Sequence, residues 1–339
     1  MKVAVIGAGC SGITAIKNLL SAGIRDVVCF EQNDRVGGNW IYSRESSHSS
    51  VMETTHIISS KKLSEYKDYP MPDDYPDYPS HQQILAYFEG YAEHFELKRY
   101  IRFNTKVDKV NRDEAGLWQI YTNGADIPET YDFLLVSNGH HSVPRHPELV
   151  RKFTGKYFHS HDFKTNEIFS GKRVLVIGGG NSACDCAVEG SRVADFVAIS
   201  MRRPQYIVPK FMLGKPTDTF NDKMRGIPEW IAEPIRKLSL KLQMGKYEYY
   251  GLNTPDFPIT KDHPTVNSEL LYMLRHGKIK PKGGIEKVDQ NRIYFTDGSS
   301  DEFDVIVAAT GYKISTPFFD PEFLDYEEAD DIKLYLRMF

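Results

Sequence analysis

The sequence is poor in cysteine and lacks a long apolar run. Its four cysteines are scattered among 339 residues, too few for a disulfide framework, which favours a reducing compartment such as the cytoplasm. No window approaches the ~18 consecutive apolar residues of a membrane span. The apolar start at residues 2–6 ends at Gly7 and is too short for a signal peptide. We therefore expect a soluble, cytoplasmic protein without a membrane span.

The sequence also has no excess of positive charge. Lys and Arg number 42 against 46 Asp and Glu, which gives a net charge of −4. Proteins that bind nucleic acid usually carry a basic face, so no nucleic-acid partner is expected. No metal-ligand motif is identified. The hydrophobic content of 41% is enough to bury a core, and the length fits two domains of ordinary size.

One arrangement of predicted elements occurs twice. Residues 2–30 and 173–200 each contain a buried strand, a helix and a second buried strand. Each unit is followed by a hairpin-like stretch and then by a strand that runs into glycine, at 131–139 and 303–311. This predicts an α/β fold with two Rossmann-like dinucleotide-binding domains, each a parallel sheet with a β-hairpin or meander extension. An internal duplication or a shared fold alone explains the repeat.

The order of the two units predicts the domain boundaries. We assign 1–145 to the first part of one dinucleotide-binding domain and 146–285 to the second domain. We assign 286–339 to a return to the first domain. The stretch near 204–265 is rich in Pro, Gly, Tyr and Lys, and it is interpreted as an insertion with a helix near 228–245.

The first glycine-rich segment reads GAGCSG from Gly7 to Gly12, directly after a strand and at the start of a helix. In this pattern Gly7 allows a tight turn, Gly9 lets a pyrophosphate approach the backbone, and Gly12 lets helix and strand pack closely. Ser11 lies in the same turn. Glu31 follows Gly7 by 24 residues, where its carboxylate can accept hydrogen bonds from a ribose 2′-OH. A glycine turn without a ligand is the alternative.

The second glycine-rich segment starts at Gly178 and has Ala183 in the third place, a substitution that the pattern tolerates. The position 24 residues after Gly178 holds Arg202, followed by Arg203. A guanidinium there can bind a 2′-phosphate through two hydrogen bonds. The second site is therefore predicted to take NADPH, unless Arg202 is a solvated surface charge.

A further loop follows the second strand and contains Gly38, Asn39 and Trp40. Its glycines allow it to lie against a cofactor, and Trp40 supplies a flat apolar wall. This suits a flavin that extends beyond its pyrophosphate, although Trp40 as an ordinary core residue is the alternative.

Between the glycine segments, residues 153–163 read FTGKYFHSHDF. They match the pattern F-x-G-x-x-x-H-x-x-x-(Y/F), and the chain thereby resembles the flavin-containing monooxygenases, which are two-dinucleotide flavoproteins. Phe163 at the end of the pattern is also compatible with the signature of the related Baeyer–Villiger enzymes. Further similar segments are Gly-Gly-x-Trp at 37–40, the loop 66–78, Gly-Asn-Ser at 180–182 and Ala-Thr-Gly-Tyr at 309–312.

The resemblance implies FAD and NADPH as cofactors. The residues expected to bind FAD are Gly7, Gly9, Ser11, Gly12, Glu31, Gly38, Asn39 and Trp40. Those expected to bind NADPH are Gly178, Gly180, Asn181, Ser182, Arg202 and Arg203. Further cofactor contacts are expected from Val107, Thr310 and Gly311. His159 of the signature is expected to set one domain against the other and to place NADP.

The chain departs from the family pattern at two places. Many relatives have Asn in a stretch like Thr-Asn-Ser-Ser-Lys, where this chain has Ile58 between Ile57 and Ser59. Ile58 cannot form a side-chain hydrogen bond, so we expect peroxide leakage, another substrate class, or replacement by Ser59 or Ser60. These two serines and His159 are the candidate catalytic residues. Relatives also continue beyond the apolar end at 332–339, which predicts a truncated return to the FAD-binding domain.

The implied activity is that of an NADPH-dependent flavin monooxygenase. NADPH reduces FAD, O2 adds to give a C4a-hydroperoxyflavin, and this oxygenates a soft N or S atom of a small molecule. The alternatives are Baeyer–Villiger oxygenation of ketones and a non-catalytic, truncated protein that binds both cofactors and leaks peroxide. A disulfide reductase is disfavoured, because side chains two apart on a helix, as at Cys184 and Cys186, diverge by about 200°. A homo-oligomer is left open.

Overall fold

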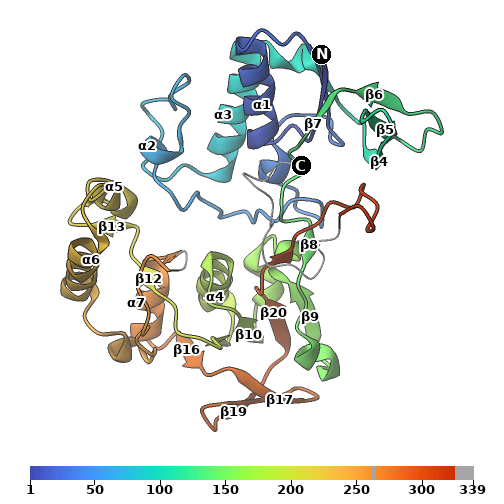
Figure 1. Cartoon of the computed structure of the whole chain (residues 1–339). Helices are drawn as coiled ribbons and strands as arrows, with labels where there is room; N and C mark the ends of the chain where they lie inside the picture. Colours follow the sequence, from blue (N-terminus) through green and yellow to red (C-terminus); the bar gives the residue numbers. More distant parts are fainter. Residues whose placement is uncertain (262–263, 325–339) are drawn as a thin grey trace.

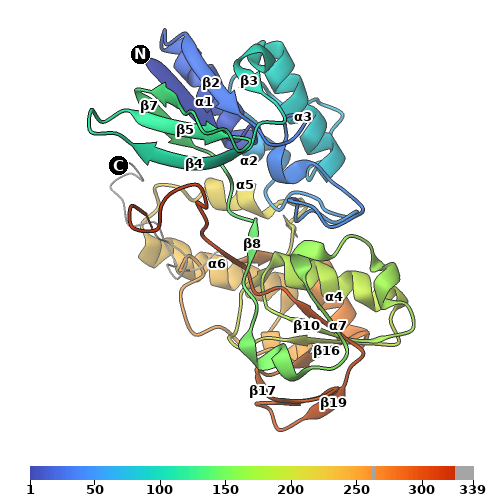
Figure 2. The same cartoon turned by 90° about the vertical axis from the view of Figure 1, so that its right-hand side faces the viewer.

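The computed structural model describes residues 1–261 and 264–324 and shows two α/β domains, one above the other in Figure 1. The chain passes between them along two short strands that pair antiparallel, β8 (Val143–Pro144) and β21 (Tyr312–Lys313) (Figure 2). None of the described helices is long and apolar enough to cross a membrane. The described 3₁₀ turns are Gly38–Trp40, Leu97–Tyr100, Glu148–Lys152, Ser160–Asp162, Asn166–Phe169 and Tyr247–Tyr250.

The first domain is built on a four-stranded parallel sheet with the order β3-β2-β1-β7. Side chains of β1 alternate between two apolar clusters, as in a strand buried on both faces. Val3 and Val5 pack against helices, and Ile6 packs against an antiparallel meander. The elements are β1 (Lys2–Ile6), α1 (Cys10–Ser21), β2 (Asp26–Phe30), α2 (Lys61–Ser64), α3 (His81–His94), β3 (Ile101–Arg102), β4 (Val107–Arg112), β5 (Trp118–Thr122), β6 (Glu129–Tyr131) and β7 (Phe133–Val136).

The second domain repeats this plan on a five-stranded parallel sheet with the order β16-β11-β10-β20-β9. Helices α4 and α7 cover one face, and the meander β17-β18-β19 covers the other. The predicted fold of two Rossmann-like domains, each with a meander, is confirmed. The elements are β9 (Lys156–His159), β10 (Arg173–Ile177), α4 (Asn181–Val193), β11 (Phe196–Ser200), α7 (Glu269–Arg275), β16 (Ile279–Lys282), β17 (Ile285–Asp289), β18 (Arg292–Phe295), β19 (Ser300–Glu302) and β20 (Val305–Ala308).

The chain returns to the first domain later than the predicted residue 286. Val288 of the meander packs against Leu175 of the second sheet, and β20 pairs with β10 in that sheet. The return follows β21, where Phe318 joins the core of the first domain. Apolar and polar residues alternate along the strands of a meander in the same way whichever sheet the meander covers. The sequence therefore could not locate this boundary. The apolar end at 332–339 lies outside the described residues.

The predicted insertion forms a subdomain between β11 and α7. The helix expected near 228–245 is α6 (Glu229–Met244). The first and last short strands, β12 and β15, pair parallel, so the insertion leaves and rejoins the domain at one place. Helix α5 contacts α2 of the first domain (Figure 1). The remaining elements are β12 (Ile207–Val208), β13 (Phe211–Met212), β14 (Lys215–Pro216), α5 (Thr217–Asp222) and β15 (Thr265–Val266).

Candidate functional site

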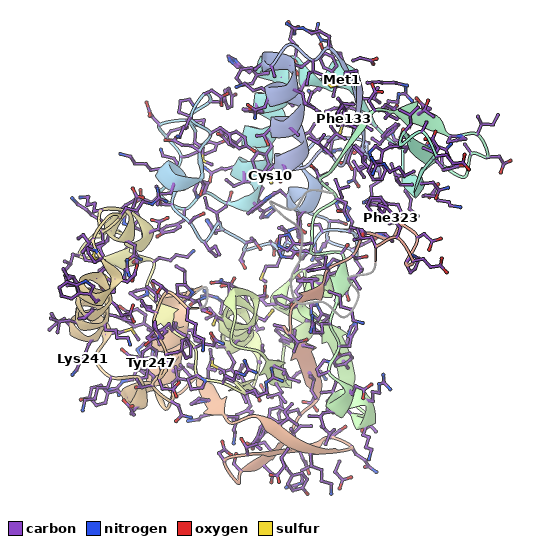
Figure 3. The ribbon with its side chains drawn as sticks, viewed as in Figure 1. Met1, Cys10, Phe133, Lys241, Tyr247 and Phe323 are labelled. Carbon is purple, nitrogen blue, oxygen red and sulfur yellow. The ribbon has the colours of Figure 1, made fainter. Side chains whose placement is uncertain are left out.

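The first glycine loop joins β1 to α1 and is tightly enclosed by backbone. Gly7 has a φ of +96°, and its N–H donates to the Phe30 carbonyl at 2.8 Å. A Cβ on Gly7 would lie 2.5 Å from the Ser137 carbonyl oxygen, and one on Gly12 would overlap the Gly7 carbonyl oxygen. Cys10, the first residue of α1, lies at the end of the helix that faces the second domain (Figure 3). Bare backbone N–H groups at a helix N-terminus have the chemistry that suits a phosphate group.

Glu31 lies directly after β2 and is only 3% exposed. Its Oε2 accepts the N–H of Ala8, within the glycine loop, at 2.7 Å. Its Oε1 accepts the backbone N–H of Asn33 at 2.8 Å and the Asn33 side-chain amide at 2.6 Å. The structure therefore places the predicted carboxylate against the loop. Asn33 was missed, although a short polar residue two positions after an acid is typical of such local bonds.

The loop with the predicted flavin-facing residues touches the first glycine loop. A Cβ on Gly38 would lie 3.0 Å from the Cα of Gly9. Asn39 and Trp40 belong to the same 3₁₀ turn as Gly38, and the Trp40 ring is half-buried against the helical core. Val107 lies elsewhere, at the start of β4, and is buried in the cluster under the meander.

The second glycine loop repeats the geometry of the first. The N–H of Gly178 donates to the Ser200 carbonyl at 3.0 Å, and a Cβ on Gly178 would overlap the Ala309 carbonyl oxygen. Ala183 occupies the place of the third glycine and is fully buried. The Asn181 side chain accepts the N–H of Val266 at 2.8 Å, which ties the insertion to the loop. The other two predicted residues, Gly180 and Ser182, are exposed at the start of α4.

Arg202 and Arg203 are exposed after β11, and neither has an ion-pair partner in the part of the chain that the structure describes. The predicted equivalence of Arg202 with Glu31 is wrong by one residue, as the strand register shows. Phe30 pairs with Ile6 in the first sheet, and Ser200 pairs with Ile177 in the second. Met201 therefore corresponds to Glu31, and Arg202 follows it. The count of 24 residues failed because the connection between helix and second strand is shorter in the second domain.

The signature residue His159 lies at the end of β9, close to the crossing between the domains. It is fully buried, and its Nδ1 accepts the N–H of His161 at 3.1 Å. Its ring centroid is 5.2 Å from that of Tyr312 and 5.7 Å from that of His146. Burial lowers the pKa of His159 to about 4, so the ring is neutral near pH 7. The remaining predicted residues at this crossing are Thr310 and Gly311, which follow β20.

The candidate catalytic serines lie where the insertion meets the first domain. Ser60 is 1% exposed, and its N–H donates to Asp218 Oδ2 of the insertion at 2.5 Å. The Ser60 hydroxyl has no hydrogen-bond partner among the described residues. The Ser59 hydroxyl lies 2.7 Å from that of Ser64. Ile58 is 46% exposed, so no core packing explains it.

The Pro- and Tyr-rich loop at 69–79 is held by two contacts that the sequence did not predict. The Lys61 ammonium group donates to three carbonyls of this loop at 3.0 to 3.1 Å. The Tyr78 hydroxyl donates to the Lys210 carbonyl of the insertion at 2.5 Å, and burial raises the pKa of Tyr78 to about 12. The loop thereby connects the candidate serines to the insertion.

The cysteines of the second domain are core residues. Cys184 and Cys186 are free and fully buried in the cluster under α4. Burial raises the pKa of both thiols, which makes them poor nucleophiles. The prediction that they pack in the core is confirmed. Over residues 1–261 and 264–324, no group of three or more His, Cys, Asp or Glu side chains is placed to hold a metal ion.

Comparison with known proteins identifies relatives over the whole chain. The family model "Flavin-binding monooxygenase-like" matches residues 1–339. Flavin-containing monooxygenase 5 of Rattus norvegicus is 35% identical over 100% of this chain and 66% of its own length. Dimethylaniline monooxygenase [N-oxide-forming] 2 of the same species is 33% identical with the same coverage. The chain thus spans slightly less than two thirds of the length of these relatives.

Solved structures show the same fold. Tmm from Pelagibacter sp. strain HTCC7211 superposes with a TM-score of 0.68 at 25% identity, over 95% of this chain and 64% of that one. An oxidized steroid monooxygenase bound to NADP gives a TM-score of 0.70 at 22% identity, over 92% of this chain and 71% of that one. The second similarity concerns the fold alone.

Proposed function

The chain belongs to the flavin-binding monooxygenase-like family, and we propose that it is an NADPH-dependent flavin monooxygenase. Its cofactors are FAD and NADPH. The proposed substrate is a small molecule with a soft nitrogen or sulfur atom, and O2 is the co-substrate. One observation carries the proposal: two glycine loops of the same geometry are followed by a buried carboxylate in one domain and by two exposed guanidinium groups in the other.

The first loop has the shape and chemistry that FAD needs. A Cβ at Gly7 or Gly12 would strike backbone atoms, so the loop offers bare N–H groups to a pyrophosphate. An ionised carboxylate has about four acceptor sites, and Glu31 uses three of them for Ala8 and Asn33. One acceptor site is left for a ribose 2′-OH.

The second loop suits NADPH better than NADH. Arg202 and Arg203 have no carboxylate partner in the described chain, so their N–H donors are available to a 2′-phosphate. A carboxylate at this position would repel that phosphate. The structural equivalent of Glu31 is Met201, which removes the repulsion.

The protein's own contribution is to position the reactants and to exclude water. Bound FAD, once reduced by NADPH, supplies oxygen transfer, which we propose to proceed through a C4a-hydroperoxyflavin. The contact between Ser60 and Asp218 joins the insertion to the segment with the candidate serines, and we propose that this junction limits access of water to bound flavin. His159 is neutral near pH 7 and lies at the domain crossing. This supports a positioning role rather than proton transfer.

The choice of a nitrogen or sulfur atom is supported by the curated relatives, one of which is named as N-oxide-forming. The exposed Ile58 supports a second candidate function, in which NADPH oxidation releases peroxide without oxygenating a substrate. The isoleucine side chain has no donor or acceptor for a hydrogen bond to an oxygen species.

Spectroscopy and a substrate panel test the proposal. We expect the purified chain to bind FAD with an absorption band at ~450 nm and to oxidise NADPH. Product formation is then measured with a thioether, a tertiary amine and a ketone, with peroxide measured in parallel. Oxygenated thioether or amine supports the proposal, ester from the ketone supports Baeyer–Villiger oxygenation, and peroxide alone supports the second candidate. A colourless protein after addition of FAD rejects all three.

A further inference from the structure

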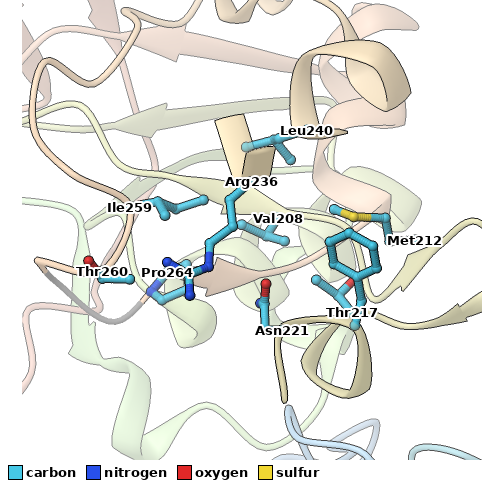
Figure 4. Close-up of a pocket in the computed structure, with 10 residues that line it drawn as sticks. Val208, Met212, Thr217, Asn221, Arg236, Leu240, Ile259, Thr260 and Pro264 are labelled. Carbon is cyan, nitrogen blue, oxygen red and sulfur yellow. The ribbon is translucent and has the colours of Figure 1, made fainter. Parts of the chain in front are cut away.

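The insertion contains a cavity that neither glycine loop lines. Its volume is about 260 Å³, and its walls come from α5, α6, β12 and the segment around Ile259 (Figure 4). A cavity of ~150 Å³ holds one benzene ring, so this one has room for about ten non-hydrogen atoms. The apolar lining residues are Val208, Met212, Phe220, Leu240, Ile259 and Pro264. The cavity is therefore suited to a hydrocarbon group.

One charged side chain lines this cavity, beside the polar residues Thr217, Asn221 and Thr260. Arg236 extends from α6 between Ile259 and Asn221 (Figure 4), and its side chain is only 12% exposed. Its Nη1 donates to Glu229 Oε2 at 2.7 Å, whereas Nε and Nη2 have no acceptor among the described residues. Glu229 is 63% exposed, so water competes with this ion pair. The guanidinium group thus retains donors for a ligand.

We propose that this cavity binds a small carboxylic acid with an unbranched hydrocarbon chain. The carboxylate accepts hydrogen bonds from Arg236, and the chain lies against Val208, Met212 and Leu240. Burial of methylene groups favours binding of the chain, and the charge-assisted bonds orient the head group. A phosphate ester would bring two negative charges to one arginine that already contacts Glu229. A monovalent carboxylate is therefore favoured.

This site is additional to the proposed monooxygenase function. Thr217 lines the cavity, and the next residue, Asp218, accepts the N–H of Ser60. The cavity therefore lies behind the contact between the insertion and the first domain. A molecule in it would touch the insertion and neither of the glycine loops.

Titration calorimetry of the FAD-loaded chain tests this proposal with octanoate, which has ten non-hydrogen atoms in its carbon chain and carboxylate, and with neutral octanamide. We expect octanoate to bind with a Kd on the order of 0.1 mM, and octanamide to bind about tenfold more weakly. The substitution R236Q should lower the octanoate affinity about tenfold, to the level of octanamide. R225Q is the matched control, because Arg225 is an 87% exposed arginine of the same insertion and does not line the cavity.

A second variant keeps the test decisive if R236Q fails to fold. Asn221 is an exposed residue that lines the cavity, so N221W should fold and should weaken the binding of both ligands. Equal affinities for octanoate and octanamide in the unaltered protein would overturn the proposal. So would absence of binding up to millimolar octanoate, or displacement of octanoate by saturating NADP+. None of these measurements requires turnover, so they are independent of the proposed oxygenation.

Discussion

The two glycine loops can be compared residue by residue, because each joins the first strand of a parallel sheet to a helix. Gly7 and Gly178 both donate their N–H to the last residue of the second strand, at 2.8 and 3.0 Å. A Cβ on either would collide with the carbonyl of the strand that enters glycine, at Ser137 or Ala309. The backbone of the dinucleotide site is thus the same in both domains.

The loops differ in their side chains. At the third position, Gly12 leaves no room for a methyl group, whereas Ala183 accommodates one. After the second strand, Glu31 is buried and bonded to its own loop, whereas Arg202 is exposed without an ion-pair partner in the described residues. The acid is part of the folded site, and the arginine is free for a ligand. We infer that the shared backbone of the two loops suits a dinucleotide, and that the side chain after the second strand distinguishes FAD from NADPH.

Exchange of the third residue of each glycine loop should have the largest effect, because only the second loop has room for a methyl group. In G12A, the new methyl group would overlap the Gly7 carbonyl oxygen, so we expect loss of FAD and of the ~450 nm band. In the reciprocal variant A183G, glycine near the start of α4 should cost about 0.5–1 kcal/mol of stability and leave FAD bound. Absorption spectra and urea denaturation measure the two effects. A yellow G12A protein would contradict the close approach seen at this loop.

Removal of the two arginines tests whether the difference in charge between the two loops selects NADPH. In the double variant R202A/R203A, we expect KM for NADPH to rise about 10- to 100-fold, because charge-assisted hydrogen bonds to the 2′-phosphate are lost. KM for NADH should hardly change. R192Q is the control, since Arg192 is already paired with Glu189 and Glu269. Equal increases for both nucleotides would refute the assignment of the 2′-phosphate site.

Loosening the insertion tests whether the two domains act together. D218A removes the carboxylate that accepts the N–H of Ser60, and we expect several-fold more peroxide per NADPH oxidised as water gains access. The matched control is D222A, because Asp222 is ion-paired only with Arg225 among the described residues. The same peroxide yield from D218A and D222A would contradict the proposed role of Asp218 in holding the insertion in place.

The histidines at the domain crossing give the smallest expected effect, on stability alone. Burial lowers the pKa of both His141 and His159 to about 4, below the ~6.5 of an unfolded chain. Between these values the unfolded state binds more protons, so stability rises with pH in this window and falls as pH drops from about 6.5 to 4. Urea midpoints at pH 5 and 7 should therefore differ less in H159N than in the unaltered protein. Identical differences would argue against a buried, neutral His159.

Site residues that are related by short spacing could be predicted from the sequence, whereas those that meet only through contacts between distant segments could not. Gly7, Gly12 and Glu31 were identified because their spacing follows from one strand, one turn and one helix. Asp218, Lys61 and the arginine in the insertion cavity were not. Ser60 and Asp218 are 158 positions apart, and no local pattern relates residues at that separation.

Two parallel sheets, two glycine loops and the opposite charges that follow them can be predicted from the residues alone. These depend on periodicity and short spacing, which the chain imposes locally. The folded structure was needed to establish that Met201 takes the place of Glu31, that the second meander belongs to the second sheet, and that the insertion rests on the segment with Ser60. Each of these depends on strand register or on packing between distant segments, and the free energy of such contacts is set by the folded arrangement rather than by neighbours in the chain.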